Sequence, residues 1–151
     1  MNDDIRTQSI AKLKALFSTL QAPATDMCSG FYRAEFIGPW WLRVSGRPSV
    51  AMSGLPGWQG KQFLSNTTAT NVLLKKGQTR QALLMHCVGG VSQVDGKQGL
   101  ALHYGADAPI PWRWVRDEMR ALDAHHILGM TVINLPLLNR LSFPFLLVRE
   151  S

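Results

Sequence analysis

The 151-residue sequence is poor in the features that mark several protein classes. Its two cysteines, Cys28 and Cys87, lack the spacing of a zinc site or a redox pair, so we expect two buried thiols. No apolar run reaches the roughly 18 to 20 residues of a membrane span, because Asn139 and Arg140 interrupt the richest stretch, 133–148. The sequence therefore predicts a chain without a membrane span.

Targeting and catalytic motifs are also lacking. The chain begins Met1-Asn2-Asp3-Asp4, which is acidic where a secretory signal is basic and then apolar, so we expect a cytoplasmic protein. A glycine-rich phosphate loop, a nucleophile elbow and a recognisable Ser/His/Asp order are absent. The sequence indicates no cofactor and no particular enzyme class.

Acidic residues are scarce relative to basic ones, with 10 Asp and Glu against 16 Lys and Arg and a formal net charge of +6. A basic surface can favour an anionic partner. The longest basic run, however, is Lys75-Lys76, and no DNA- or RNA-recognition signature accompanies it. We therefore expect solvated surface charge and no nucleic-acid partner.

The composition that is present, 46% hydrophobic and 17% charged, is typical of a globular chain, and we expect one domain over residues 1–151. An amphipathic helix is predicted over 4–20, where apolar residues recur at the spacing of one helix face: Ile10, Leu13, Phe17 and Leu20. Pro23 ends it. We expect this N-terminal segment, 1–22, to pack on the rest of the domain and to close the mouth of a barrel.

From Gly30 onward, short β-like runs are separated by glycine and proline. The candidate strands are 31–37, 57–64, 72–74, 79–88, 91–94, 99–104, 112–122, 125–133 and 143–148. A short helix is expected after Pro39, and Asp95-Gly96 supplies the positive φ angles of a tight hairpin turn. Seven to nine strands without a long crossover helix predict a mostly β fold with an antiparallel sheet. Closure into a small β-barrel would remove its exposed edges.

Three segments share motifs with a known bacterial family. They read FSTL at 17–20, GFYRAEF at 30–36 and GWQGKQF at 57–63. In order and spacing they resemble the bacterial proteins named for a G-x-W-x-G motif, and residues 104–149 resemble the C-terminal domain of unknown function that accompanies it. Tyr32 and Ala34 stand where the family has its tryptophan and second glycine. The resemblance implies a lipocalin-like, or calycin, barrel behind an N-terminal helix.

The four histidines are candidates for metal or haem ligation. Adjacent residues on a strand point to opposite faces, so His125 and His126 cannot both line one interior. His86 and His103 lie on other strands, and nothing in their spacing requires that they converge on an ion. We therefore expect no metal site.

A strand face and the tryptophans offer the remaining candidate site residues. Arg33 and Glu35 share one face; inside a barrel they would orient a polar ligand group, and outside it they would form an exposed ion pair. The sequence has five tryptophans, which can line a pocket or fill a core, and Trp112 and Trp114 are expected on one strand face.

The leading functional hypothesis is a protein that binds a small apolar or amphipathic molecule in the barrel interior. The candidate ligand-binding residues are Arg33, Glu35, Trp58, His103, Tyr104, Trp112 and Trp114. The alternative is an enzyme on the same scaffold, in which Glu35, His103 or Tyr104 performs acid/base chemistry on a bound metabolite.

Overall fold

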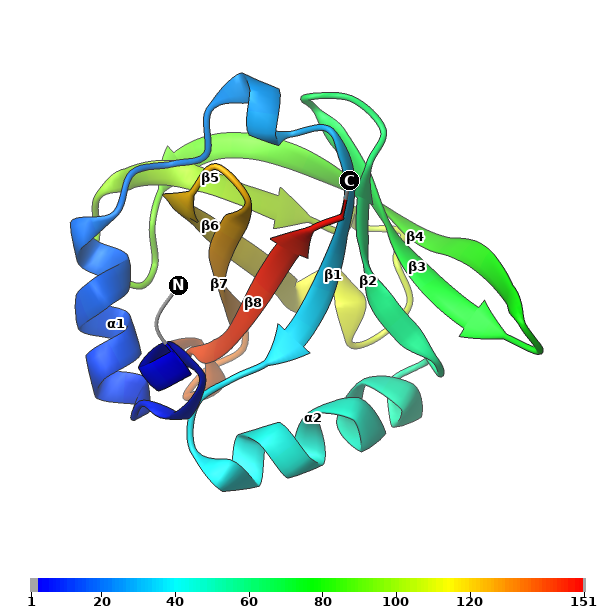
Figure 1. The fold of residues 1–151 in the computed structure, drawn as a ribbon, viewed down its shortest axis with the longest axis horizontal. Helices are drawn as coiled ribbons and strands as arrows, with labels where there is room; N and C mark the ends of the chain where they lie inside the picture. The colour runs from blue at the N-terminus through cyan, green and yellow to red at the C-terminus, as the bar shows by residue number, and fades with distance from the viewer. Residues whose placement is uncertain (1–2, 151) are drawn as a thin grey trace.

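The computed structural model describes residues 3–150, which form a closed antiparallel β-barrel (Figure 1). Residues 1–2 and 151, which belong to the expected domain and N-terminal segment, lie outside the described residues. The strands are β1 (Gly30–Phe36), β2 (Trp58–Phe63), β3 (Thr68–Lys75), β4 (Gln78–Val91), β5 (Gln98–His103), β6 (Val115–Asp123), β7 (His126–Ile133) and β8 (Phe143–Arg149). Each strand pairs with the next, and β8 pairs with β1 to close the barrel. The predicted mostly β, antiparallel barrel is confirmed.

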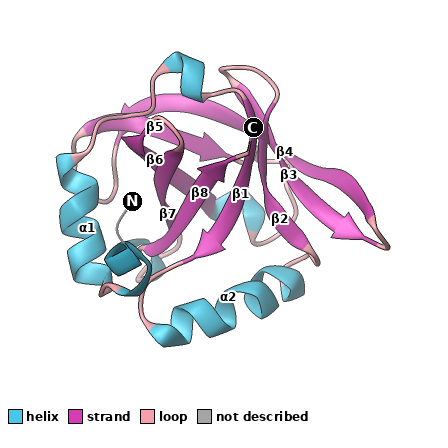
Figure 2. Cartoon of the chain, viewed as in Figure 1, coloured by secondary structure: helices cyan, strands magenta, loops and turns pink. Residues whose placement is uncertain are grey.

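Within the described residues, two α-helices and four short 3-10 turns accompany the barrel, and Figure 2 shows the helices beside the strands. They are η1 (Asp3–Thr7), α1 (Ile10–Thr19), η2 (Thr25–Met27), α2 (Trp40–Met52), η3 (Trp112–Trp114) and η4 (Leu138–Arg140). The single helix expected over 4–20 is divided at Ser9, whose side chain accepts a hydrogen bond from the Lys12 amide and so begins α1. None of the helices within residues 3–150 has the length and apolar character needed to span a membrane.

The helix expected after Pro39 runs on to Met52, although Gly46 and Pro48 lie within it. Conversely, β6 begins at Val115 and not at residue 112. The preceding segment turns instead of extending, because the Trp112 amide donates to the Pro109 carbonyl at 2.8 Å. A turn containing residues 95–96 does join β4 to β5, but it spans residues 92–97 and is longer than the tight turn expected. Gly96 has a positive φ, +74°, whereas Asp95 does not.

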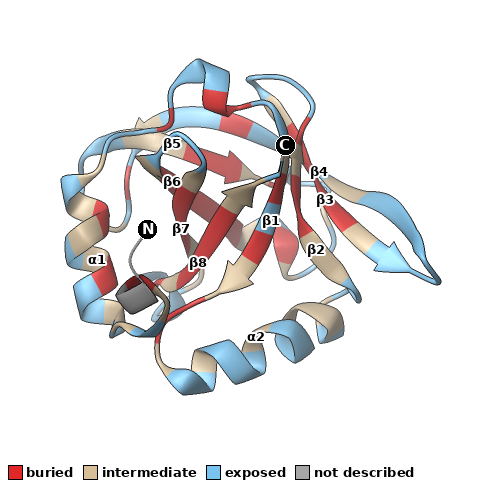
Figure 3. Cartoon of the chain, viewed as in Figure 1, coloured by how far each residue is buried: buried red, intermediate tan, exposed pale blue. Residues whose placement is uncertain are grey.

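Helix α1 packs on the outer wall of the barrel, at the left of Figure 1. Its buried residues Leu13 and Phe17 contact the outward side chains of β7 and β8, among them Leu128 and Leu146. The prediction that this helix closes the barrel mouth is therefore wrong. The outer face of β7 and β8 is itself apolar, and it buries the apolar stripe of the helix. In Figure 3, red marks buried residues on α1 and on the strands of the barrel.

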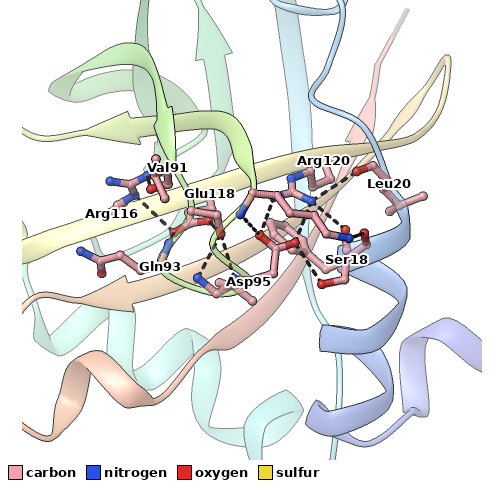
Figure 4. Close-up of polar contacts among 12 residues, drawn as sticks. Ser18, Leu20, Val91, Gln93, Asp95, Arg116, Glu118 and Arg120 are labelled. Atoms are coloured by element: carbon pink, nitrogen blue, oxygen red, sulfur yellow. Dashed lines mark hydrogen bonds and ion pairs between the residues drawn. The ribbon is translucent and has the colours of Figure 1, made fainter.

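A buried arginine of the barrel forms hydrogen bonds with the C-terminal end of α1 (Figure 4). Arg120 of β6, 1% exposed, donates to the main-chain carbonyls of Phe17 and Leu20 and lies 4.4 Å from the Phe17 ring centroid. The same guanidinium forms two hydrogen bonds with the Asp95 carboxylate, at 3.0 and 3.1 Å. Asp95 also accepts from Ser18. The contacts join the helix end, the β4–β5 turn and the barrel wall in one polar cluster.

Candidate functional site

A pocket of about 360 Å³ lies between α2 and one end of the barrel. Helix α2 crosses this end, at the bottom of Figure 1, and its Trp41, Ser45 and Ser49 face the pocket. The walls are largely aromatic and aliphatic: Phe36, Leu42, Val50, Leu55, Trp58, Pro111, Trp112, Val115, Ile133, Phe143, Pro144 and Phe145. The pocket has the apolar lining of a small-molecule site.

Two glycines determine how Trp58 enters the pocket. Gly57 has φ +74°, and a Cβ there would lie 2.2 Å from the Leu74 carbonyl oxygen. A Cβ on Gly60 would lie 2.0 Å from the Tyr32 carbonyl oxygen. The β2–β3 register also shifts between Trp58 and Gly60, as in a β-bulge. The shift turns both Trp58 and Lys61, three residues apart, toward the barrel interior.

A buried ion pair lies at the inner end of the pocket. The Lys61 Nζ is 2.9 Å from the Asp117 Oδ2, and the two side chains are 2% and 6% exposed. Burial opposes the charged form of Lys61 more than any other single influence, but Asp117 and Tyr104 together outweigh it and raise the pKa of the lysine above its usual value. Lys61 therefore stays charged, and its charge is paired with the Asp117 carboxylate inside the pocket.

Three further polar side chains complete a network around this pair. The Lys61 Nζ donates to the Asn71 Oδ1 at 3.0 Å and to the Tyr104 hydroxyl at 3.3 Å. The Asn71 Nδ2 also donates to the Tyr104 hydroxyl, at 3.0 Å, and the Thr131 hydroxyl donates to the Asp117 Oδ1 at 2.8 Å. We call Lys61, Asn71, Tyr104, Asp117 and Thr131 the pocket floor.

Beyond the floor, the other half of the barrel is filled by a close-packed apolar core. None of its side chains lines the pocket: Met27, Cys28, Tyr32, Phe63, Ala69, Met85, Cys87, Leu102, Met119, Ile127 and Leu147. A molecule that enters past α2 would therefore meet apolar walls first and the polar floor last.

Three of the residues singled out from the sequence meet in the pocket. Trp58, Tyr104 and Trp112 all line it, from β2, the residue that follows β5, and η3. The Trp58 Nε1 donates to the Asn71 Oδ1, and the Trp112 Nε1 donates to the Ser53 carbonyl beyond the end of α2. Trp114 does not line the pocket, and it shares the turn η3 with Trp112 rather than one strand face.

Arg33 and Glu35 lie on the outer face of β1, away from the pocket. Their neighbours Tyr32 and Ala34 point inward instead. Glu35 pairs with Arg6 at 2.8 Å and also with Arg33. Burial opposes its ionisation, but the two arginines lower the pKa of Glu35. The second of the two arrangements considered for this face, an ion pair outside the barrel, is the one observed.

His103 also lies outside the barrel, since the side chains of Leu102 and Tyr104 on either side of it point inward. It stands opposite His86 on β4 and Arg116 on β6. Burial, with help from Arg116, lowers the pKa of His103. Within residues 3–150, no three His, Cys, Asp or Glu side chains come together as a candidate metal site.

Four residues of the pocket floor were not among the candidates predicted from the sequence: Lys61, Asn71, Asp117 and Thr131. Two of them carried a signal, because Asn71 alternates with apolar inward residues on β3 and Asp117 alternates with Val115 and Met119 on β6. A polar residue at an inward position of a strand indicates a buried contact or a ligand. Lys61 gave no such signal, since the shift near Gly60 interrupts the alternation of β2.

Comparisons with known proteins bear on the fold. No protein-family model matches the chain, and no curated protein matches it significantly. Among solved structures, a protein from Thermomonospora curvata superposes with a TM-score of 0.71 at 18% sequence identity, over 96% of this chain and 90% of that one. This similarity supports a small β-barrel and shows nothing about activity.

Proposed function

We propose that the protein binds a small apolar or amphipathic molecule in the barrel interior, with the pocket beneath α2 as its site. The observation that carries the proposal is the pocket of about 360 Å³ with aromatic walls and a polar inner end. Removing apolar ligand surface from water supplies about 25 cal/mol per Å². The polar side chains of the floor are paired with one another, which favours binding over acid/base catalysis.

The proposal includes a relationship to the G-x-W-x-G family and a lipocalin-like barrel. It is supported by the place of Tyr32, which stands where the family has tryptophan. Its ring is buried inside the barrel, its hydroxyl donates to the Met27 carbonyl at 2.7 Å, and the Arg149 guanidinium lies 5.5 Å from the ring centroid. These contacts join the first strand, the last strand and the η2 segment at the end of the barrel opposite the pocket.

The protein purified from its native host, analysed by native mass spectrometry and solvent extraction, should carry an apolar small molecule. Returning that molecule to stripped protein should change the tryptophan fluorescence, because Trp58 and Trp112 line the pocket. In an Ile133→Trp variant the larger side chain should fill the pocket, so this variant should be purified without the small molecule. Leu84→Trp, on the exposed surface of β4, is the matched control and should keep the molecule. Empty wild-type protein, together with no response to any apolar probe, would refute the proposal.

A further inference from the structure

The hydrogen bonds within the pocket floor restrict the kind of ligand that fits, because they leave few donors and acceptors free. A lysine ammonium has three protons and no acceptor. The Lys61 Nζ lies within hydrogen-bond distance of four acceptors, the Asp117 Oδ2, the Asn71 Oδ1, the Tyr104 hydroxyl and the Met85 Sδ, at 2.9, 3.0, 3.3 and 3.4 Å. All three donor positions are therefore occupied within the protein. Lys61 has none left for an anionic ligand.

The network also fixes the orientation of the Asn71 amide. Its Oδ1 receives hydrogen bonds from the Trp58 Nε1 and from the Lys61 Nζ, both of which are only donors. The other amide atom is therefore the nitrogen, which donates to the Tyr104 hydroxyl at 3.0 Å.

Tyr104 is consequently left with one free proton. Its hydroxyl oxygen accepts from both Lys61 and Asn71, which uses its two lone pairs. No hydrogen bond found within residues 3–150 uses this hydroxyl as a donor. Burial raises the pKa of Tyr104, so the hydroxyl keeps its proton. The proton is available to an acceptor in the pocket that Tyr104 lines.

The floor also retains acceptor capacity. The Asp117 carboxylate has about four acceptor positions, of which Thr131 and Lys61 use two. Lys61 and Asp117 are the charged residues among those that line the pocket, and their charges cancel. A ligand carboxylate buried in the pocket would have no unpaired cation beside it. A ligand ammonium buried there would lie close to the positive charge of Lys61. Burying an uncompensated charge costs several kcal/mol.

We propose that the pocket takes a neutral apolar molecule whose buried end carries a carbonyl or hydroxyl oxygen, which accepts the hydrogen bond of Tyr104. A hydroxyl at that end would also donate to Asp117. The inference rests on the proposed function and adds to it the chemical class of the ligand: a ketone, aldehyde, ester or alcohol, and not a fatty acid or an amine.

Three probes of nearly the same shape test this inference. Pentylbenzene, methyl phenylpropyl ketone and phenylbutyrate share a phenyl ring and an alkyl chain, and end in a methyl group, a ketone and a carboxylate. Titration calorimetry at neutral pH, with native protein stripped of bound molecules, should give an affinity for the ketone about tenfold or more above that for phenylbutyrate. The ketone should also bind more tightly than pentylbenzene.

Tyr104→Phe identifies the donor. We expect it to weaken ketone binding roughly 2- to 10-fold, the loss of one neutral hydrogen bond, and to leave pentylbenzene binding unchanged. Tyr32→Phe is the matched control, since it removes a buried hydroxyl at the opposite end of the barrel and should not alter the ratio of the two affinities.

The outcomes separate the two proposals. If no probe binds the native protein, the proposed function fails. If pentylbenzene binds as tightly as the ketone, or phenylbutyrate binds most tightly, the pocket stands and the inferred ligand class is wrong. The series on the native protein decides the matter even where a variant fails to fold.

Discussion

Replacing Lys61 by methionine tests whether the pocket floor is a dry, charge-balanced site. The substitution roughly keeps the length of the side chain and removes the ammonium, which leaves the Asp117 carboxylate, 6% exposed, with the Thr131 hydroxyl as its remaining partner. Breaking a buried ion pair on one side costs about 3 to 5 kcal/mol. This is a large part of the 5 to 15 kcal/mol by which a domain is usually stable.

Urea unfolding, followed by circular dichroism and tryptophan fluorescence, measures the loss. In the double variant Lys61→Met with Asp117→Leu both charges are absent, and we expect it to regain about 2 kcal/mol or more relative to Lys61→Met alone. Lys75→Met, at an exposed position of β3, is the control and should change stability by less than about 0.5 kcal/mol. A loss under about 1 kcal/mol for Lys61→Met would show that water reaches the pair and would refute the reasoning.

The same pair predicts how stability depends on alkaline pH. Because the folded-state pKa of Lys61 is raised above 10.5, the folded protein keeps a proton that the unfolded chain releases. The stabilisation of the folded state by charged Lys61 is fully present below pH 10.5 and is lost as the pH rises through the folded-state pKa of Lys61. The stability difference between wild type and the double variant should shift in favour of the double variant over that interval.

Three further predictions concern other parts of the molecule. Burial opposes the ionisation of Asp95 most strongly, but hydrogen bonds from Arg120, the Lys97 amide and Ser18 together outweigh it and lower the pKa of Asp95 from 3.8 to about 2. The ionised Asp95 stabilises the fold by roughly 1 kcal/mol after solvent screening, and this stabilisation is lost as the pH falls through this range. The difference in free energy of unfolding between wild type and Asp95→Asn, measured with urea, should therefore decrease in acid. A difference that does not change with pH would contradict the assignment. Gly129→Ala places a Cβ 2.2 Å from the Phe145 ring and should cost about 1 to 3 kcal/mol, measured as a lower Tm. Gly46→Ala would stabilise an isolated helix by about 1 kcal/mol. In the folded protein, however, its Cβ would lie 2.4 Å from the Phe36 ring, so we expect no rise in Tm. A higher Tm would mean that α2 can shift without an energetic cost.

The barrel could be predicted because its signals are local. Short runs bounded by glycine and proline, and the Asp95-Gly96 turn, each specify a strand or a hairpin without reference to distant residues. The position of α1 could not be predicted in this way. Its apolar stripe is equally suited to a barrel mouth or to an outer wall, and the choice depends on the outward residues of β7 and β8, more than a hundred positions away.

The aromatic part of the candidate site was predicted from the sequence, and its polar floor was not. Trp58 and Trp112 are large and apolar, so composition alone suggests a role in lining or packing. The polar floor depends on register: a shift in β2 brings Lys61 to the interior, where it meets Asp117 from a strand more than fifty residues later. Asn71 and Asp117 show in the local alternation of their strands, but nothing local shows that Lys61 joins them.

The packing on the two sides of β7 and β8 has a consequence for motions of the chain. Ile127 and Leu147 face the inner core, while Leu128 and Leu146 face α1, so both faces of this strand pair are covered. Their amide hydrogens should exchange with deuterium only when the whole molecule unfolds. Helix α2, in contrast, has no buried residue among those described and should exchange through local opening. A molecule could therefore enter or leave beneath α2 on a timescale much shorter than that of global unfolding.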